Sequence, residues 1–138
     1  MPRDNSITSD VAVTERRPSG RRTALSRATV DSLAQLQRVK ADLEAVSLKL
    51  TGFDPGKLNE SDRAIWEDQV DKVDLAIARA CSSLLSSLTA AFERELPDIA
   101  AATGELAQSL QRLKKISEVI DAVAGVLGVI EKIIALGR

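Results

Sequence analysis

Histidine and cysteine, two residue types that often carry out enzyme chemistry, are almost absent from this chain. The sequence has no histidine and a single cysteine, Cys81. It therefore lacks the commonest general base, and it lacks every zinc site that needs imidazole or several thiolates. A nucleophilic thiol needs a neighbouring base or cation, whereas Cys81 lies beside a predicted apolar stripe of a helix, so we interpret it as structural. The sequence predicts a protein that is not an enzyme and that uses no metal or cofactor.

The segment from Gly52 to Leu58 shares some features with a phosphate-binding loop, because two glycines precede a lysine. Its glycines are one residue too close together, and Leu58 stands where the motif needs Ser or Thr. A helix rather than a strand is also predicted before it. The sequence Asp54-Pro55-Gly56 is typical of a turn. We therefore interpret the segment as a connection between two helices.

Four acidic residues, Glu67, Asp68, Asp71 and Asp74, follow this turn at helical spacing. The helical repeat places them on neighbouring positions of one helix, where carboxylates could bind a hard cation. No EF-hand loop and no second acid-rich segment accompanies them. Carboxylates near the start of a helix are also favoured by the helix dipole, so we interpret this group as a solvated surface.

The residues that could position such sites fall into a polar N-terminal segment and three long stretches of helical periodicity. Residues 1–23 lack sustained periodicity and carry more arginine than acidic residues, which predicts a flexible basic arm. From about residue 24 to 51, apolar residues at alternating steps of three and four predict a first helix. This stripe consists of Leu36, Val39, Leu43, Val46 and Leu50.

A second helix is predicted from about residue 60 to 96, with Asn59 or Ser61 as its N-cap, and a third from about 98 to 136. The apolar stripe of the second consists of Trp66, Val70, Val73, Ile77, Ala80, Leu84, Leu88 and Ala91, and that of the third of Leu113, Ile116, Ile120, Val123, Leu127, Ile130 and Ile134. Pro97 lacks an N–H and disfavours α geometry at the preceding residue. We expect the corner between these helices at Pro97, with Gly104 as the alternative.

Taken together, these stretches predict an all-α fold, in which residues 24–138 form an elongated, coiled-coil-like antiparallel three-helix bundle of up-down-up topology behind a disordered N-terminal arm. The part from residue 119 to 136 is more apolar than such a bundle requires. At 100° per residue its apolar side chains cover an arc of roughly 200°, about twice the width of an ordinary amphipathic stripe. We expect part of this arc to be exposed and to contact a partner. The residues of this predicted contact surface are Val119, Val126, Val129, Ile133 and Leu136.

Two explanations of this additional apolar surface stay open. In the first, the protein is a non-catalytic interaction or assembly module that buries the C-terminal helix against another copy of itself or a partner helix. In the second, it is membrane-active and places this helix in lipid as a pore-forming or interfacial element. Asp121, Glu131 and Lys132 would each cost about 2.5 to 3.5 kcal/mol near the centre of a bilayer. We therefore favour burial against a protein partner.

The formal net charge of -1 argues against a surface built for nucleic acid. The N-terminus shows no apolar stretch typical of a signal peptide, and a lone cysteine fits a reducing compartment, so we expect a cytoplasmic location. A further alternative is a secreted effector or adaptor in which the polar arm serves as an export signal.

Overall fold

The computed structural model describes residues 27–86 and 88–137, and Ser32–Arg138 form one compact unit. The regular elements among the described residues are α-helices and one short 3-10 helix, without strands, which confirms the all-α class. Their elements are α2 (Arg27–Thr51), η1 (Pro55–Lys57), α3 (Glu60–Leu85), α4 (Ala90–Leu110), α5 (Ile116–Gly125) and α6 (Leu127–Leu136). The predicted arm of residues 1–23 lies outside the described residues.

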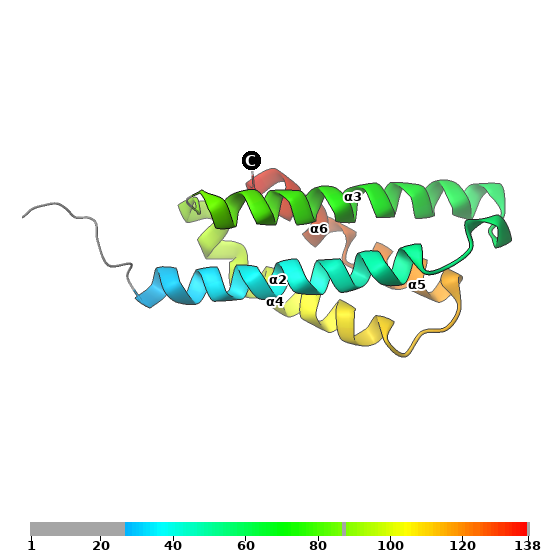
Figure 1. Ribbon diagram of the computed structural model, residues 1–138, viewed down its shortest axis with the longest axis horizontal. Coiled ribbons are helices and arrows are strands. Elements are labelled where there is room, and N and C mark those ends of the chain that lie inside the picture. The colour runs from blue at the N-terminus through cyan, green and yellow to red at the C-terminus, as the bar shows by residue number, and fades with distance from the viewer. Residues whose placement is uncertain (1–26, 87, 138) are drawn as a thin grey trace, which may run out of the picture. The chain divides into compact units, whose positions relative to one another are not determined.

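Within this unit the helices form four segments whose direction reverses at each connection, with α5 and α6 together as the fourth (Figure 1). Helix α3 runs back along α2, and the Ser47 hydroxyl of α2 donates a hydrogen bond of 2.9 Å to the Asp74 carboxylate of α3. Helix α4 lies on the other side of α2, and α5 and α6 pack against both α3 and α4. The predicted three-helix bundle is not confirmed, because the described residues form five α-helices.

The apolar stripe predicted for the first helix forms one wall of the core. All five of its residues, from Leu36 to Leu50, are fully buried. The indole N–H of Trp66 donates a hydrogen bond of 2.9 Å to the carbonyl of Leu50, which ties the start of α3 to the end of α2. Asn59 is the N-cap of α3, since its side chain accepts from the backbone N–H of Asp62 at 2.8 Å. These local signals act as the sequence predicts.

The corner after α3 lies at neither of the two predicted positions, because both Pro97 and Gly104 are inside α4. Helix α3 ends at Leu85, and the hydroxyl of Ser86 donates to the carbonyl of Ser82 at 2.8 Å. Serine side chains compete in this way with the helical backbone pattern. Thr89 then starts α4, because its hydroxyl accepts the backbone N–H of Phe92 at 3.1 Å. The predicted second helix, residues 60–96, is therefore two helices.

Pro97 is accommodated inside α4 because it lies on the exposed side of that helix. The carbonyl four residues earlier loses its helical donor there, but on the solvent side water can replace it. The opposite side of α4 carries Phe92, Leu96 and Ile99, which are buried in the core. Burial of this face outweighs the cost of about 3 kcal/mol for proline in a helix interior.

The third predicted helix, residues 98–136, is interrupted at two places. Residues 111–115 connect α4 to α5, and Val126 separates α5 from α6 with a non-helical backbone of φ -118 and ψ 13. Gly125 and Gly128 lie on either side of that second break, and glycine weakens a helix by about 1 kcal/mol relative to alanine. The first interruption reverses the chain, so that α5 and α6 can cover α3 and α4.

Candidate interaction surface

The structure buries much of the contact surface predicted for the C-terminal helix. Val119 and Ile133 are fully buried in the core of a single chain, so neither is exposed in this structure, and their contact with a partner stays a prediction. Val126, Val129 and Leu136 are half-buried and pack against that core. A partner contact of these three residues stays a prediction, but they do not form a free apolar face.

The wide apolar arc is covered because α5 and α6 have two neighbours, α3 on one side and α4 on the other. Both charged residues of α6 extend to these neighbours. Lys72 of α3 lies 2.8 Å from the carboxylate of Glu131, and Lys132 lies 2.7 Å from the carboxylate of Glu95 on α4. The apolar surface of residues 119–136 is wider than a three-helix bundle can cover, but it is covered within this bundle of four segments.

These ion pairs shift the protonation of their members in the expected direction. The hydrogen bond from Lys132 lowers the pKa of the Glu95 carboxyl, and the same bond raises the pKa of Lys132. Lys72 donates hydrogen bonds to Glu131 and to Asp68, and these two bonds raise the pKa of Lys72. All of these side chains are at least partly exposed to solvent, which screens their charges, so the ion pairs position α6 more than they stabilise the fold.

Large apolar side chains remain exposed on other helices of the compact unit. The largest exposed fractions are those of Leu85, the last residue of α3, at 85%, and Leu48 of α2, at 74%. Ile65 and Leu75 of α3 have smaller exposed fractions. Leu48 differs from the others because a shallow hollow lies on each side of it. It is therefore the apolar side chain around which a docking surface can be built.

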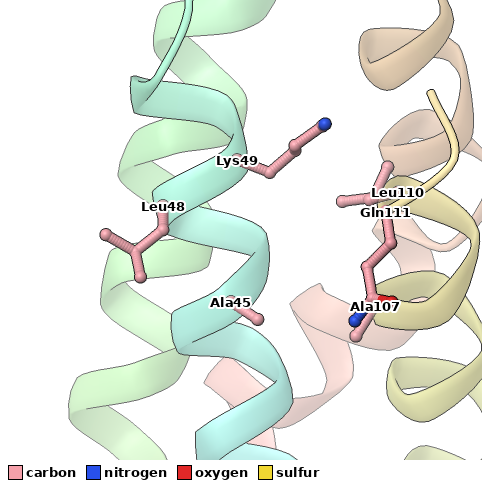
Figure 2. Close-up of a pocket in the computed structure, with 6 residues that line it drawn as sticks. All are labelled: Ala45, Leu48, Lys49, Ala107, Leu110 and Gln111. Atoms are coloured by element: carbon pink, nitrogen blue, oxygen red, sulfur yellow. The ribbon is translucent and has the colours of Figure 1, made fainter. Parts of the chain in front are cut away.

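The first hollow lies between α2 and α3 and has a volume of about 460 Å³; it is lined by Glu44, Ser47, Leu48 and Ile77. The second lies between α2 and α4, has a volume of about 330 Å³, and is lined by Ala45, Leu48, Lys49, Ala107, Leu110 and Gln111. In Figure 2, Leu48 points away from α4, whereas Ala45 and Lys49 lie on the side of α2 that faces α4. Both hollows are lined mainly by carbon.

Opposite its buried stripe, α2 carries a row of exposed residues without charge, which we call the α2 outer face. It consists of Ala34, Gln37, Ala41, Ala45 and Leu48. Steps of three, four and seven residues keep such a row on one side of a helix. Asp42 and Lys49 border this face on the side of α4, with Arg38 next to them by the helical repeat, and Glu44 borders it on the side of α3. The α2 outer face is thus an uncharged strip with charged residues along both edges.

The charged edge on the side of α4 is only lightly engaged within the chain. Burial raises the pKa of the Asp42 carboxyl, and the nearby positive charge of Arg38 opposes that shift. The ammonium of Lys49 lies 5.7 Å from the centre of the Phe53 ring, a contact that is weak at an exposed site. Among the described residues, neither Asp42 nor Lys49 forms a salt bridge.

Cys81, the turn at Asp54 and the acidic residues of α3 have positions that fit structural roles. Cys81 is half-buried in α3, and the Asp54 side chain accepts the backbone N–H of Gly56 at 2.9 Å, as in a turn. Asp68 pairs with Lys72 at 3.3 Å. In the part of the chain that the structure describes, no three His, Cys, Asp or Glu residues are grouped so that they could hold a metal ion.

Two broader observations bear on function. Among residues 27–86 and 88–137, no helix combines the length and the apolar character that crossing a bilayer requires. Comparison of the chain with protein-family models, with curated proteins and with solved structures gives no match.

The sequence contains a signal for the α2 outer face that apolar periodicity alone does not reveal. Leu48 stands between Val46 and Leu50 and falls outside the spacing of the buried stripe, so a helix must turn it away from the core. Ala41 and Ala45 occupy the same side. What the sequence could not show is that α3 and α4 leave this side of α2 open.

Proposed function

We propose that the protein is a non-catalytic helical interaction module that binds another protein through the α2 outer face. The observation that carries the proposal is Leu48, which is 74% exposed between two hollows lined mainly by carbon. Full burial of a leucine side chain contributes about 1.5 to 3 kcal/mol. Burial of one such side chain at the desolvated centre of an interface can therefore supply a substantial part of the binding energy.

The charge distribution supports docking at this place. The residues of the α2 outer face carry no charge, and the one carboxylate that lines the hollow beside Leu48, that of Glu44, is half-exposed and already paired with Lys40. Arg38 and Lys49 lie at the edge, where interfaces commonly keep their charged residues in contact with solvent. An apolar centre with a polar rim is the usual organisation of a protein interface.

The absence of histidine from the sequence and the half-buried position of its one cysteine support a role without catalysis. A general base would have to be a carboxylate or a lysine. Among the carboxyl groups of the described residues, burial raises the pKa of Asp42, but the side chain lies at the edge of an open surface and not in a closed pocket. The chemistry available therefore favours recognition over reaction.

Site-specific photocrosslinking in the native cell tests this proposal. A diazirine amino acid is placed at Ala45 and, as a matched control, at Ala101, an exposed alanine of α4. We expect irradiation to give a protein adduct from position 45 and none from position 101. Equal adducts from both positions, or none from position 45, would refute the proposal.

Membrane activity is a second candidate, and the composition of α6 is the observation that favours it. Glu131 and Lys132 are the only charged residues between Leu127 and Leu136, and both would have to leave their partners on α3 and α4 before the helix could reach lipid. Dye-loaded anionic vesicles test this candidate. Neither leakage nor co-flotation of the protein with the vesicles would eliminate it. The cytoplasmic location and the export alternative stay predictions.

A further inference from the structure

We infer that the partner on the α2 outer face is a second copy of this chain, packed antiparallel about a two-fold axis that passes between Ala45 and Leu48. The inference rests on the proposed function and names the partner for the same surface. Three features of that surface carry it: its shape, its charges and the small side chain at its centre.

The shape of the surface is complementary to itself. A two-fold interface brings the same patch of both copies together, so a protruding side chain must have its own receiving hollow nearby. Leu48 protrudes on the side of α2 turned away from α4, and the hollow floored by Ile77 lies on that side, between α2 and α3. In a two-fold antiparallel pair, the α3 side of one copy meets the α3 side of the other. Each Leu48 therefore reaches the hollow of the opposite copy.

The charges on the other side of α2 are arranged to pair in the same geometry. Asp42 and Lys49 are seven residues apart, so two helical turns place them on one side of the helix, toward α4. When the axis passes between residues 46 and 47, position 49 of one copy lies level with position 44 of the other. Lys49 is then only two residues, or about 3 Å along the helix, from Asp42 of the opposite copy. The two-fold axis repeats this contact, so two opposite-charge pairs border the apolar centre.

The centre of the surface permits close contact. Ala45 is exposed and lies where the two α2 helices would cross, and a small side chain at a crossing point allows helix axes to approach to about 8 Å. In the chain as described, Asp42 and Lys49 have no salt-bridge partner to give up. Association thus gains two ion pairs without breaking one.

Sedimentation equilibrium of the full chain tests the inference. Over a concentration range of roughly 1 to 500 µM, which covers weak to moderate affinities, we expect the mass to rise from 14.8 kDa toward twice that value. Leu48→Asp should hold the chain at the monomer mass. Leu75→Asp, a matched exposed leucine on α3, should leave the rise unchanged. Circular dichroism of both variants checks that the helices are intact.

Charge reversal tests the antiparallel geometry. Asp42→Lys alone and Lys49→Asp alone should each weaken dimerisation about tenfold, because like charges then face each other across the axis. The double variant should recover the affinity of the original chain. Positions 42 and 49 are too far apart on one helix to pair with each other, so recovery requires contact between copies.

The outcomes separate this inference from the proposed function. A monomer at all concentrations, a dimer that survives Leu48→Asp, or a double variant without recovery would each overturn the inference. If position 45 then crosslinks to a different protein, the proposed function stands with another partner. If position 45 gives no adduct at all, both fall together.

Discussion

Replacement of Gln69 by methionine should leave the protein as stable as before or make it more stable, although the side chain is buried and hydrogen-bonded. Gln69 lies in the core of the bundle, where its amide nitrogen donates a hydrogen bond of 2.9 Å to the carbonyl of Ile120 on α5. Its amide oxygen is buried without a hydrogen-bond partner. Methionine has a similar shape and removes both polar atoms.

The expected magnitude follows from these two contacts. Loss of the hydrogen bond to Ile120 costs about 1 kcal/mol. Removal of a buried, unpaired polar atom returns about 1 to 3 kcal/mol. The free energy of unfolding of Gln69→Met should therefore lie between no change and an increase of about 2 kcal/mol, which would appear as a rise of a few degrees in Tm.

Urea unfolding followed by circular dichroism measures this difference, with Gln69→Glu as the companion variant. A carboxylate at this position is desolvated, which raises its pKa above the ordinary value of about 4.3. The folded state then binds the proton more tightly than the unfolded state, so the stability of Gln69→Glu should fall as the pH rises from 4 to 8, by about 1.4 kcal/mol for each unit of pKa difference.

Two results would refute this reasoning. A loss of more than about 1.5 kcal/mol in Gln69→Met would mean that the amide oxygen has a partner, such as a bound water, and that the whole amide is worth keeping. A stability of Gln69→Glu that does not depend on pH would mean that position 69 is hydrated and does not belong to the core.

Three further predictions concern other parts of the bundle. Gly128→Ala should stabilise the protein by about 0.5 to 1 kcal/mol, since an added Cβ meets nothing within 4 Å and alanine strengthens α6. Gly137→Ala should instead destabilise the protein, because its Cβ would lie 2.6 Å from the Cβ of Arg79 on α3. Urea unfolding of both variants measures the sign of each change. Leu43→Ala should cost about 2 to 5 kcal/mol in the same assay because Leu43 is fully buried, whereas Leu48→Ala should change little in the monomer. At pH values above the ordinary pKa of glutamate, Glu95→Gln should lower the Tm, because it removes the ion pair with Lys132 of α6. This difference in Tm should disappear as the pH falls through the lowered pKa of Glu95, since protonation then breaks the ion pair in the original chain as well.

The sequence by itself determined the helical class and the side of α2 that enters the core. The spacing from Leu36 to Leu50 can place these residues on one side only if the chain is helical, and all of them are buried. The cap at Asn59 and the turn at Asp54 are likewise local, because each depends on a side chain that bonds to backbone two or three residues away. Features of this kind do not depend on the rest of the fold.

Only the tertiary structure decided how many helical segments there are and which surfaces stay open. Pro97 is a strong local signal for a helix end, but burial of Phe92 and Leu96 on the opposite side of α4 outweighs it. Val119 and Ile133 have the same apolar character as an exposed docking residue would have, and they are buried because α3 and α4 pack on both sides of the last helices. Periodicity shows which side of a helix is apolar, whereas contacts between segments distant in sequence decide whether that side meets the core, a partner or water.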